Sequence, residues 1–225
     1  MDSSIKHCII SVGKGGWYPE GVERLEKSLN YHGFTGDVIT WKRRLPPNSP
    51  THKENPYAFK TYAFRWAVEQ GYTHIMWLDS SAWVIKNPSQ IFDIINEQGH
   101  YFWGSGHNCA QTCNDKSLEY FGITRDQAEV MHDLSSGLVG LNITNERSKQ
   151  FLGLWLEACD NGIFKGSRLH DGQSQDPRFC FHRQDQSCAS IIANQLGMKI
   201  DQPNILCGYY APVMPESLVV CYKGM

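Results

Sequence analysis

The sequence predicts an α/β fold in which helices flank a mixed central sheet, and two observations carry this prediction. A strand, a glycine-containing loop, a helix and a second strand follow one another at the N-terminus, which is how α/β folds commonly begin. The run from His74 to Leu78 is short, apolar and bounded by polar residues, as expected of a strand buried inside a sheet. With 225 residues and no internal repeat, the chain is expected to form a single domain over residues 1–225.

The N-terminal elements follow from the spacing of their apolar residues. Residues 6–12 are predicted as a strand and residues 37–41 as the next one, with a helix at 20–31 between them. Val22, Leu25 and Leu29 recur at helical spacing, and Gly33 is a typical helix stop. This order is the opening of a Rossmann-like half.

The rest of the chain alternates between the two element types. A loop is expected at 44–56, followed by a helix at 57–70 with Phe59, Tyr62, Ala63, Trp66 and Ala67 on its apolar face. The remaining elements are predicted as strands ending at 79, at 83–85, 101–103 and 137–142; helices opening at 87–89 and at 148–161 and 185–196; helical patches at 116–121 and 125–132; and short strands from 205 on.

Composition excludes several classes of function. The net charge is −2, so no basic excess points to a nucleic-acid partner. The short basic cluster Lys42-Arg43-Arg44 either faces phosphates or is simply solvated. No run of about 18 apolar residues predicts a membrane span. The first residues lack the apolar core of a signal peptide, and we expect a cytoplasmic protein.

The eight cysteines fit a reducing compartment, because most of them lie in apolar stretches and are expected to pack as small hydrophobic residues. Cys109 and Cys113, preceded by His107, form one close pair, and no second pair stands out. Plain packing, a disulfide and a structural zinc site are the three interpretations of this pair.

The carboxylate most suited to chemistry is Asp79, which directly follows the buried strand and precedes Ser80 and Ser81. Central strands of α/β sheets deliver their C-terminal residues to the crevice where ligands bind. A carboxylate there can hold Mg²⁺ or Mn²⁺ on a diphosphate, because these hard cations prefer oxygen ligands. A capping or turn acid is the alternative.

Five stretches, in order, resemble the sequence pattern of nucleotide-sugar glycosyltransferases of the GT-A fold, and together they span most of the chain. They are the N-terminal strand with its glycine loop, the helix start Asn55-Pro56-Tyr57-Ala58-Phe59-Lys60, the segment Trp77 to Pro88 around Asp79, the small-residue strand Ser135 to Asn142, and the helix start His182 to Ser187. The resemblance implies transfer of a sugar from a nucleotide diphosphate-sugar donor to a hydroxyl of a glycan, protein or small-molecule acceptor.

The metal motif of that family is incomplete in this chain. The resemblance implies that Asp79 binds the metal–diphosphate, but Ser81 stands where the family has its second acid. The family's C-terminal histidine ligand is also missing, because no histidine follows His182. Lys60 and Arg65 are therefore candidates for part of the role of the cation.

The resemblance also implies which residues contact the donor. The expected nucleotide-sugar-binding residues, besides Asp79, are Ser11, Val12, Gly13, Tyr57, Lys60, Leu78, Ser80, Ser81, Ser135, Ser136, Gly137 and Gln186. Gly13 would allow a close approach of the backbone to the nucleotide. For Lys60, a solvent-exposed helix lysine is the alternative.

The second expected catalytic residue is Asp185, which contacts donor hydroxyls, acts as a general base, or only caps its helix. Asp171, Asp133, His170 and His182 are the other candidates for the base. Among the aromatic residues, Trp17, Trp83 and Trp103 lie near expected strand ends and are candidate sugar platforms. The alternative function is a non-catalytic nucleotide- or sugar-binding module that has lost a full metal site.

Overall fold

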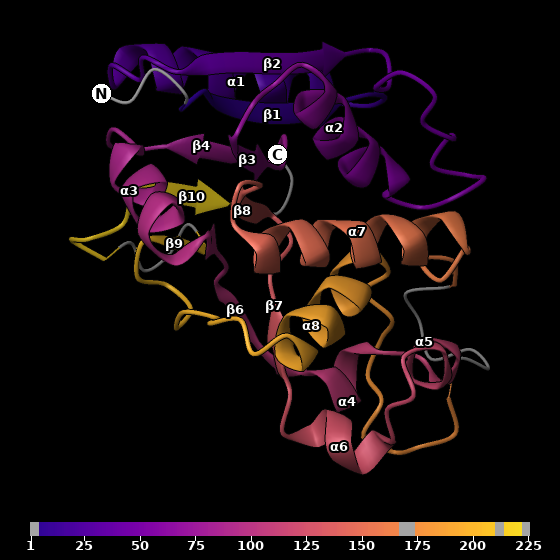
Figure 1. The fold of residues 1–225 in the computed structure, drawn as a ribbon. Helices are drawn as coiled ribbons and strands as arrows, with labels where there is room; N and C mark the ends of the chain where they lie inside the picture. The colour runs from indigo at the N-terminus through magenta and orange to yellow at the C-terminus, as the bar shows by residue number, and fades with distance from the viewer. Residues whose placement is uncertain (1–4, 167–173, 210–213, 222–225) are drawn as a thin grey trace.

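The computed structural model describes residues 5–166, 174–209 and 214–221 and has a mixed five-stranded sheet at its centre (Figure 1). The strand order is β2 (Asp37–Lys42), β1 (His7–Gly13), β3 (His74–Leu78), β8 (Leu138–Asn142) and β5 (His100–Tyr101). β1 is parallel to both β2 and β3, whereas β8 is antiparallel to β3 and to β5. The predicted α/β class and mixed sheet are confirmed.

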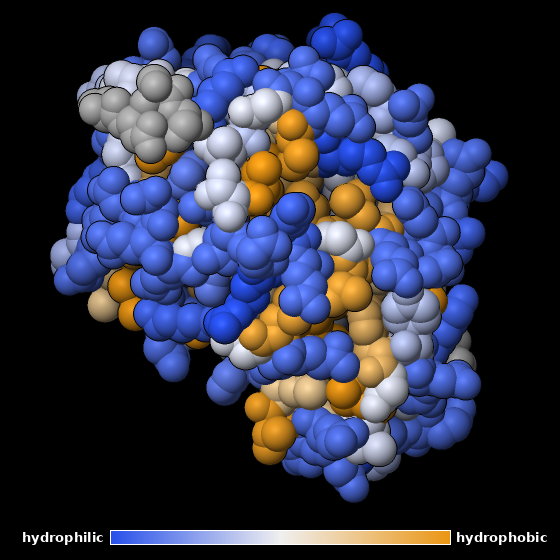
Figure 2. Space-filling model, in the orientation of Figure 1, coloured by the Kyte–Doolittle hydropathy of each residue, from blue (hydrophilic) through white to orange (hydrophobic). Residues whose placement is uncertain are grey.

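Helices bury both faces of this sheet. The longer helices are α1 (Tyr18–Tyr31), α2 (Ala58–Glu69), α3 (Ser89–Gln98), α7 (Glu146–Asp160) and α8 (Asp185–Gln195). Ile10 of β1 belongs to the core formed with α2, α7 and α8, whereas its neighbour Ile9 belongs to the core formed with α1 and α3. Because side chains alternate along a strand, α1 and α3 cover one face and α2, α7 and α8 the other. The outer surface in this orientation is mostly hydrophilic, with a hydrophobic band across its middle (Figure 2).

Two small sheets complete the strands. β4 (Ala82–Val84), β10 (Val219–Cys221) and β9 (Cys207–Tyr209) form one of them, which confirms the short strands expected near the C-terminus. β6 (Gly104–Asn108) and β7 (His132–Leu134) form the other. In the sequence, these two strands are separated by the short helices α4 (Cys109–Thr112), α5 (Asp115–Tyr120) and α6 (Arg125–Glu129).

Two predictions are wrong in the segment from Tyr101 to Leu134. The helix expected at 125–132 ends at Glu129, because His132 pairs with Asn108 and Leu134 with Gly104. The strand expected at 101–103 is β5, and Trp103 instead makes an isolated bridge to Asp201.

The buried face of α2 also differs from the predicted one. Ala63 and Ala67 are buried as predicted, but Lys60 and Phe64 are buried with them, whereas Phe59 and Trp66 are only partly buried. The apolar stripe is therefore shifted by about one residue and includes a lysine.

Cys109 and Cys113 are both buried and free, and they pack in a small core with Leu118, Ala128 and Ile191. This arrangement supports the packing interpretation of the pair. Across the described ranges, no helix has the length and apolarity needed to cross a membrane.

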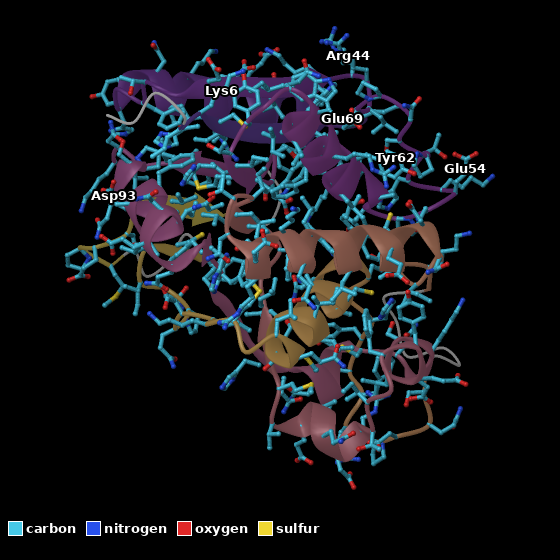
Figure 3. All side chains as sticks on the ribbon, in the orientation of Figure 1. Lys6, Arg44, Glu54, Tyr62, Glu69 and Asp93 are labelled. Atoms are coloured by element: carbon cyan, nitrogen blue, oxygen red, sulfur yellow. The ribbon has the colours of Figure 1, made fainter. Side chains whose placement is uncertain are left out.

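The loop that connects β2 to α2 is exposed at its start. Lys42, Arg43 and Arg44 are exposed, and Arg44 and Glu54 project outward from this part of the chain (Figure 3). The basic cluster is thus exposed to solvent, which is one of the two interpretations given above.

Gly21 allows α1 to pack directly against the turn after β3. A Cβ atom at Gly21 would lie 2.2 Å from the main-chain oxygen of Ser80. We expect Gly21→Ala to lower the free energy of unfolding by about 1–3 kcal/mol, because neither backbone can yield easily. The matched control is Gly153→Ala in α7, where a Cβ meets nothing within 4 Å and helix propensity favours alanine by up to about 1 kcal/mol. Urea unfolding measures both, and equal stability of the two variants would contradict this packing.

Candidate active site

A cleft of about 770 Å³ lies at the carboxyl ends of β1 and β3. The register pairs Ile10 with Trp77, and its continuation brings Val12 level with Asp79. The walls are formed by Val12, Lys14, Gly15, Trp17, Tyr18, Leu45, Thr51, His52, Lys53, Tyr57, Phe59, Trp77, Asp79, Ser80 and Ser81. The cleft therefore combines aromatic walls with lysines and one carboxylate.

Asp79 is fixed in the cleft wall and is partly open to it. Its side chain is 34% exposed. Trp77 Nε1 donates to its Oδ1 at 2.7 Å, and its main-chain N–H donates to the Gly137 carbonyl at 2.9 Å. These bonds orient the carboxylate and tie β3 to the small-residue segment before β8.

Lys60 is buried directly beneath Asp79. Its side chain is 2% exposed, and its Nζ lies 3.1 Å from Asp79 Oδ1 and 3.1 Å from Asp185 Oδ2. Nζ also donates to the carbonyl and the Oγ of Ser136, both at 3.0 Å. Burial by itself would lower the pKa of the ammonium, but the charges of Asp185 and Asp79 outweigh burial and raise that pKa. The interpretation of Lys60 as a solvent-exposed lysine is thus wrong.

Asp185, the first residue of α8, is the second carboxylate of this cluster. Burial raises its pKa, opposed by the charge of Lys60 and reinforced by the charge of Asp79. Asp185 is 2% exposed and does not line the cleft. The structure brings Asp185 together with Asp79 through Lys60, and Asp185 does more than cap its helix.

The surroundings of Asp133, one of the candidate bases, indicate a structural role. It is fully buried, and burial raises its pKa against four hydrogen bonds. Its oxygens accept from Ser105 Oγ at 2.5 Å, Thr112 Oγ1 at 3.0 Å, Ser190 Oγ at 2.9 Å and Gln186 Nε2 at 2.6 Å. Gln186 Oε1 in turn accepts from the Ser136 N–H at 3.3 Å. Asp133 thereby anchors Gln186 and the segment that contacts Lys60.

The other predicted donor-binding residues fall into two groups. Val12, Tyr57, Ser80 and Ser81 lie in the cleft wall. The second group lies behind the wall and comprises Ser11, Gly13, Leu78, Ser135, Ser136, Gly137 and Gln186.

Three members of the second group serve the packing of the fold. Ser11 is fully buried and Leu78 belongs to the core of α1 and α3. At Gly13, a Cβ would lie 2.5 Å from the Tyr18 carbonyl oxygen, so this glycine accommodates α1.

Two further candidates, His182 and Arg65, do not line the cleft. His170 and Asp171 fall outside the described residues. His182 is fully buried, which lowers its pKa to about 4. Arg65 pairs with Asp160 at 3.0 Å on the surface, so it is no substitute for a cation at Asp79.

Of the tryptophans considered as sugar platforms, Trp17 lines the cleft, Trp103 is buried in the core and Trp83 stacks against Arg24 at 4.3 Å. Sequence reasoning missed other wall residues, namely Lys14, Leu45, His52, Lys53, Phe59 and Trp77. A weak signal existed for Trp77, an aromatic residue two positions before Asp79 in a strand.

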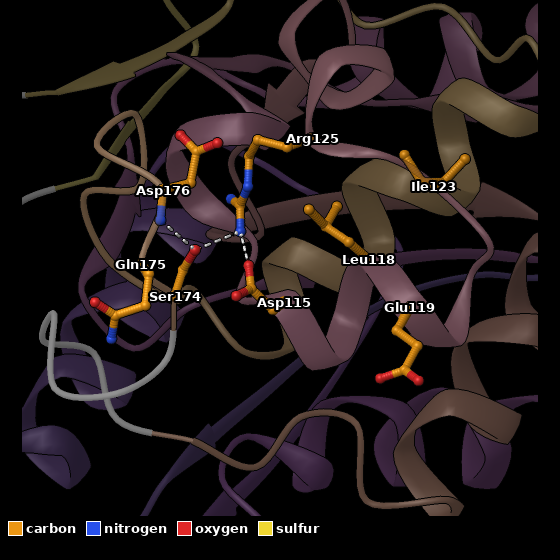
Figure 4. Close-up of a pocket in the computed structure, with 8 residues that line it drawn as sticks. All are labelled: Asp115, Leu118, Glu119, Ile123, Arg125, Ser174, Gln175 and Asp176. Atoms are coloured by element: carbon orange, nitrogen blue, oxygen red, sulfur yellow. Dashed lines mark hydrogen bonds and ion pairs between the residues drawn. The ribbon is translucent and has the colours of Figure 1, made fainter.

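A second cavity of about 410 Å³ lies between α5 and the segment 174–176 (Figure 4). Arg125 donates there to the carbonyls of Ala110 and Cys113, both at 2.6 Å, and to Ser174 Oγ at 3.1 Å, and it pairs with Asp115. Its guanidinium therefore holds segments of the fold together. Among the described residues that line this cavity, there is no cluster like that of Lys60, Asp79 and Asp185.

The residues around Asp79 do not fit a divalent cation. One oxygen of Asp79 is already shared by Lys60 and Trp77. The Ser81 carbonyl accepts from Arg24 Nη2 at 2.9 Å, so both predicted metal ligands contact a cationic side chain. Within the described ranges, no group of three or more His, Cys, Asp or Glu side chains is placed to hold a metal ion.

Structural comparison identifies the fold. The chain matches the crystal structure of a glycosyltransferase involved in the glycosylation of the major capsid of PBCV-1, with a TM-score of 0.53, 12% identity, and coverage of 98% of this chain and 96% of that one. It also matches the bifunctional glycosyltransferase WbbM, with a TM-score of 0.54, 11% identity, and coverage of 100% of this chain and 46% of that one. No protein-family model and no curated protein sequence matches the chain. The chain has the GT-A-like fold of glycosyltransferases.

Proposed function

We propose that this protein, as a single domain, transfers a sugar from a nucleotide diphosphate-sugar donor to a hydroxyl of a glycan, protein or small-molecule acceptor. The observation that carries the proposal is the position of Asp79. Its carboxylate is one-third exposed and borders a cleft of about 770 Å³ at the carboxyl end of the central strand. Ligands of open α/β sheets bind at this edge, and the fold is shared with glycosyltransferases.

The walls of the cleft suit the parts of such a donor. Tyr57 and Phe59, which are partly exposed and whose ring centroids are 5.9 Å apart, offer apolar surface to a base or a sugar ring. Lys14 and Lys53 supply positive charge for the diphosphate. The carboxylate of Asp79, which is 34% exposed, can accept hydrogen bonds from donor hydroxyls.

Transfer requires that the acceptor oxygen bonds to the anomeric carbon while the bond from that carbon to the diphosphate breaks. The electron pair of the broken bond leaves with the diphosphate, and the proton of the acceptor hydroxyl passes to an oxygen of that departing diphosphate. Charge that develops on the diphosphate must be stabilised by fixed positive groups. In this proposal Asp79 is the catalytic residue that touches the donor, and Asp185 is a positioning residue that acts through Lys60.

A divalent cation, Mn²⁺ or Mg²⁺, held by Asp79 and Ser81 stays a prediction from the sequence. The contacts of Lys60 with Asp79 and of Arg24 with Ser81 argue against it, and no step above depends on it.

The experiment is to incubate the protein with a panel of UDP- and GDP-sugars and to measure release of the nucleoside diphosphate. We expect slow release from at least one donor, accelerated by a hydroxyl acceptor. Absence of release for every donor and acceptor would contradict the proposal. Saturable binding of UDP or GDP without any turnover would instead favour a non-catalytic nucleotide- or sugar-binding module, an alternative that the poor fit to a metal ion supports.

A further inference from the structure

We propose that Lys60 supplies, from within the chain, the positive charge that a divalent cation would bring to this site, so that nucleotide binding and sugar transfer need no added metal. This inference rests on the function proposed above and concerns the same cleft.

The surroundings of the Lys60 ammonium resemble those of a bound ion. Four oxygens lie within 3.1 Å of Nζ, from Asp79, Asp185 and the main chain and side chain of Ser136. The side chain is 2% exposed, so water does not compete for these contacts. A buried lysine needs such paired partners to remain charged, and the cluster provides two carboxylates.

The same arrangement disfavours a divalent ion. Mg²⁺ and Mn²⁺ require several oxygen ligands at short distances. The Oδ1 atom of Asp79 already pairs with the ammonium of Lys60 and accepts a hydrogen bond from Trp77, and the Ser81 carbonyl accepts a hydrogen bond from Arg24. An added ion would lie close to two fixed cationic side chains and would be repelled by both.

The charge balance of the cleft points the same way. Among the described residues that line it, the charged side chains are Lys14, Lys53 and Asp79. Lys60 and Asp185 lie just behind the wall, so three lysines stand against two carboxylates at this site, and it is the charge of Lys60 that leaves the balance positive. The cleft is therefore positive without a metal, which is what a nucleoside diphosphate requires.

The test uses protein freed of metals with EDTA. We expect UDP or GDP to bind with a dissociation constant that differs by less than about threefold between EDTA and excess Mn²⁺. Nucleotide release from donor sugars should likewise persist in EDTA. A gain of more than about tenfold on adding Mn²⁺ would overturn the inference, whereas absence of binding and of turnover under both conditions would count against the proposed function instead.

A second readout is independent of nucleotide and of activity. Electron paramagnetic resonance of Mn²⁺ alone should reveal no bound ion in the wild-type protein, and a bound ion in Lys60→Ala, in which the carboxylates are freed. The matched control is Lys42→Ala, whose exposed side chain pairs with Glu26 at 2.7 Å and which should behave as wild type. If Lys60→Ala does not fold, the wild-type measurement still decides: Mn²⁺ bound to wild type and lost in Asp79→Asn would overturn the inference.

Discussion

Lys60→Met should lower the free energy of unfolding by about 3–5 kcal/mol, the cost of breaking a buried ion pair from one side. The change removes the ammonium that lies 3.1 Å from each of Asp79 and Asp185. Asp185 is 2% exposed, so its charge would remain buried with no cation beside it. Urea unfolding at neutral pH measures the loss.

Two controls make this result specific. Lys42→Met removes an exposed pair and should cost less than about 1 kcal/mol. The double variant Lys60→Met/Asp185→Leu removes both charges and should recover part of the stability. A loss in Lys60→Met no larger than that in Lys42→Met would contradict the structural role of Lys60.

The loss in Lys60→Met should also depend on pH in a definite direction. Burial already raises the pKa of Asp185, and removal of Lys60 raises it further. A carboxyl with a raised pKa binds its proton more tightly in the folded state, so folding is favoured at acidic pH and disfavoured as pH rises through the raised pKa. The stability deficit should therefore be smallest near pH 4, about the ordinary pKa of Asp, and largest at neutral pH.

Asp79→Asn should lower the rate of nucleotide release on the order of 100-fold, the size of effect seen when one fixed polar group of a reacting site is removed. The amide has the size of the carboxylate. It lacks the negative charge that pairs with Lys60, and it is a weaker acceptor of hydrogen bonds from donor hydroxyls. Because Asp79 is 34% exposed, we expect the fold to persist.

The control for this variant is Asp160→Asn, which removes the surface partner of Arg65 and should leave the release rate unchanged. Initial rates under saturating donor compare the three proteins. A rate in Asp79→Asn within about threefold of the wild type would show that Asp79 has no part in the reaction.

Much of the central sheet could be predicted because its elements carry clear periodicity. The apolar run of β3 stops at Asp79, and this stop predicts the polar edge where the cleft lies. The helices α1 and α7 likewise place their buried residues at helical spacing.

The sheet of β6 and β7 could not be predicted in the same way. β6 reads Gly-Ser-Gly-His-Asn, a composition with low strand propensity. Its strand character depends on pairing with β7, which follows three short helices later in the chain. Only tertiary structure brings these segments together.

The role of Lys60 was also hidden in the sequence. The residue falls on the buried stripe of α2 with Phe64 and Ala67, but lysines are almost never fully buried without a partner. Its partners are supplied by the end of β3 and the start of α8, and no local pattern links these segments. The cleft walls from the loop before α2 were missed for a related reason, since an irregular loop has no periodicity.

The central claim is that a nucleoside diphosphate binds in the cleft beside Asp79. A crystal of the protein soaked with UDP or GDP tests it most directly. We predict density for the base against Tyr57 and Phe59 and for the diphosphate between Asp79 and the lysines of the wall, Lys14 and Lys53. Density at another part of the surface, with the cleft left empty at saturating nucleotide, would contradict it.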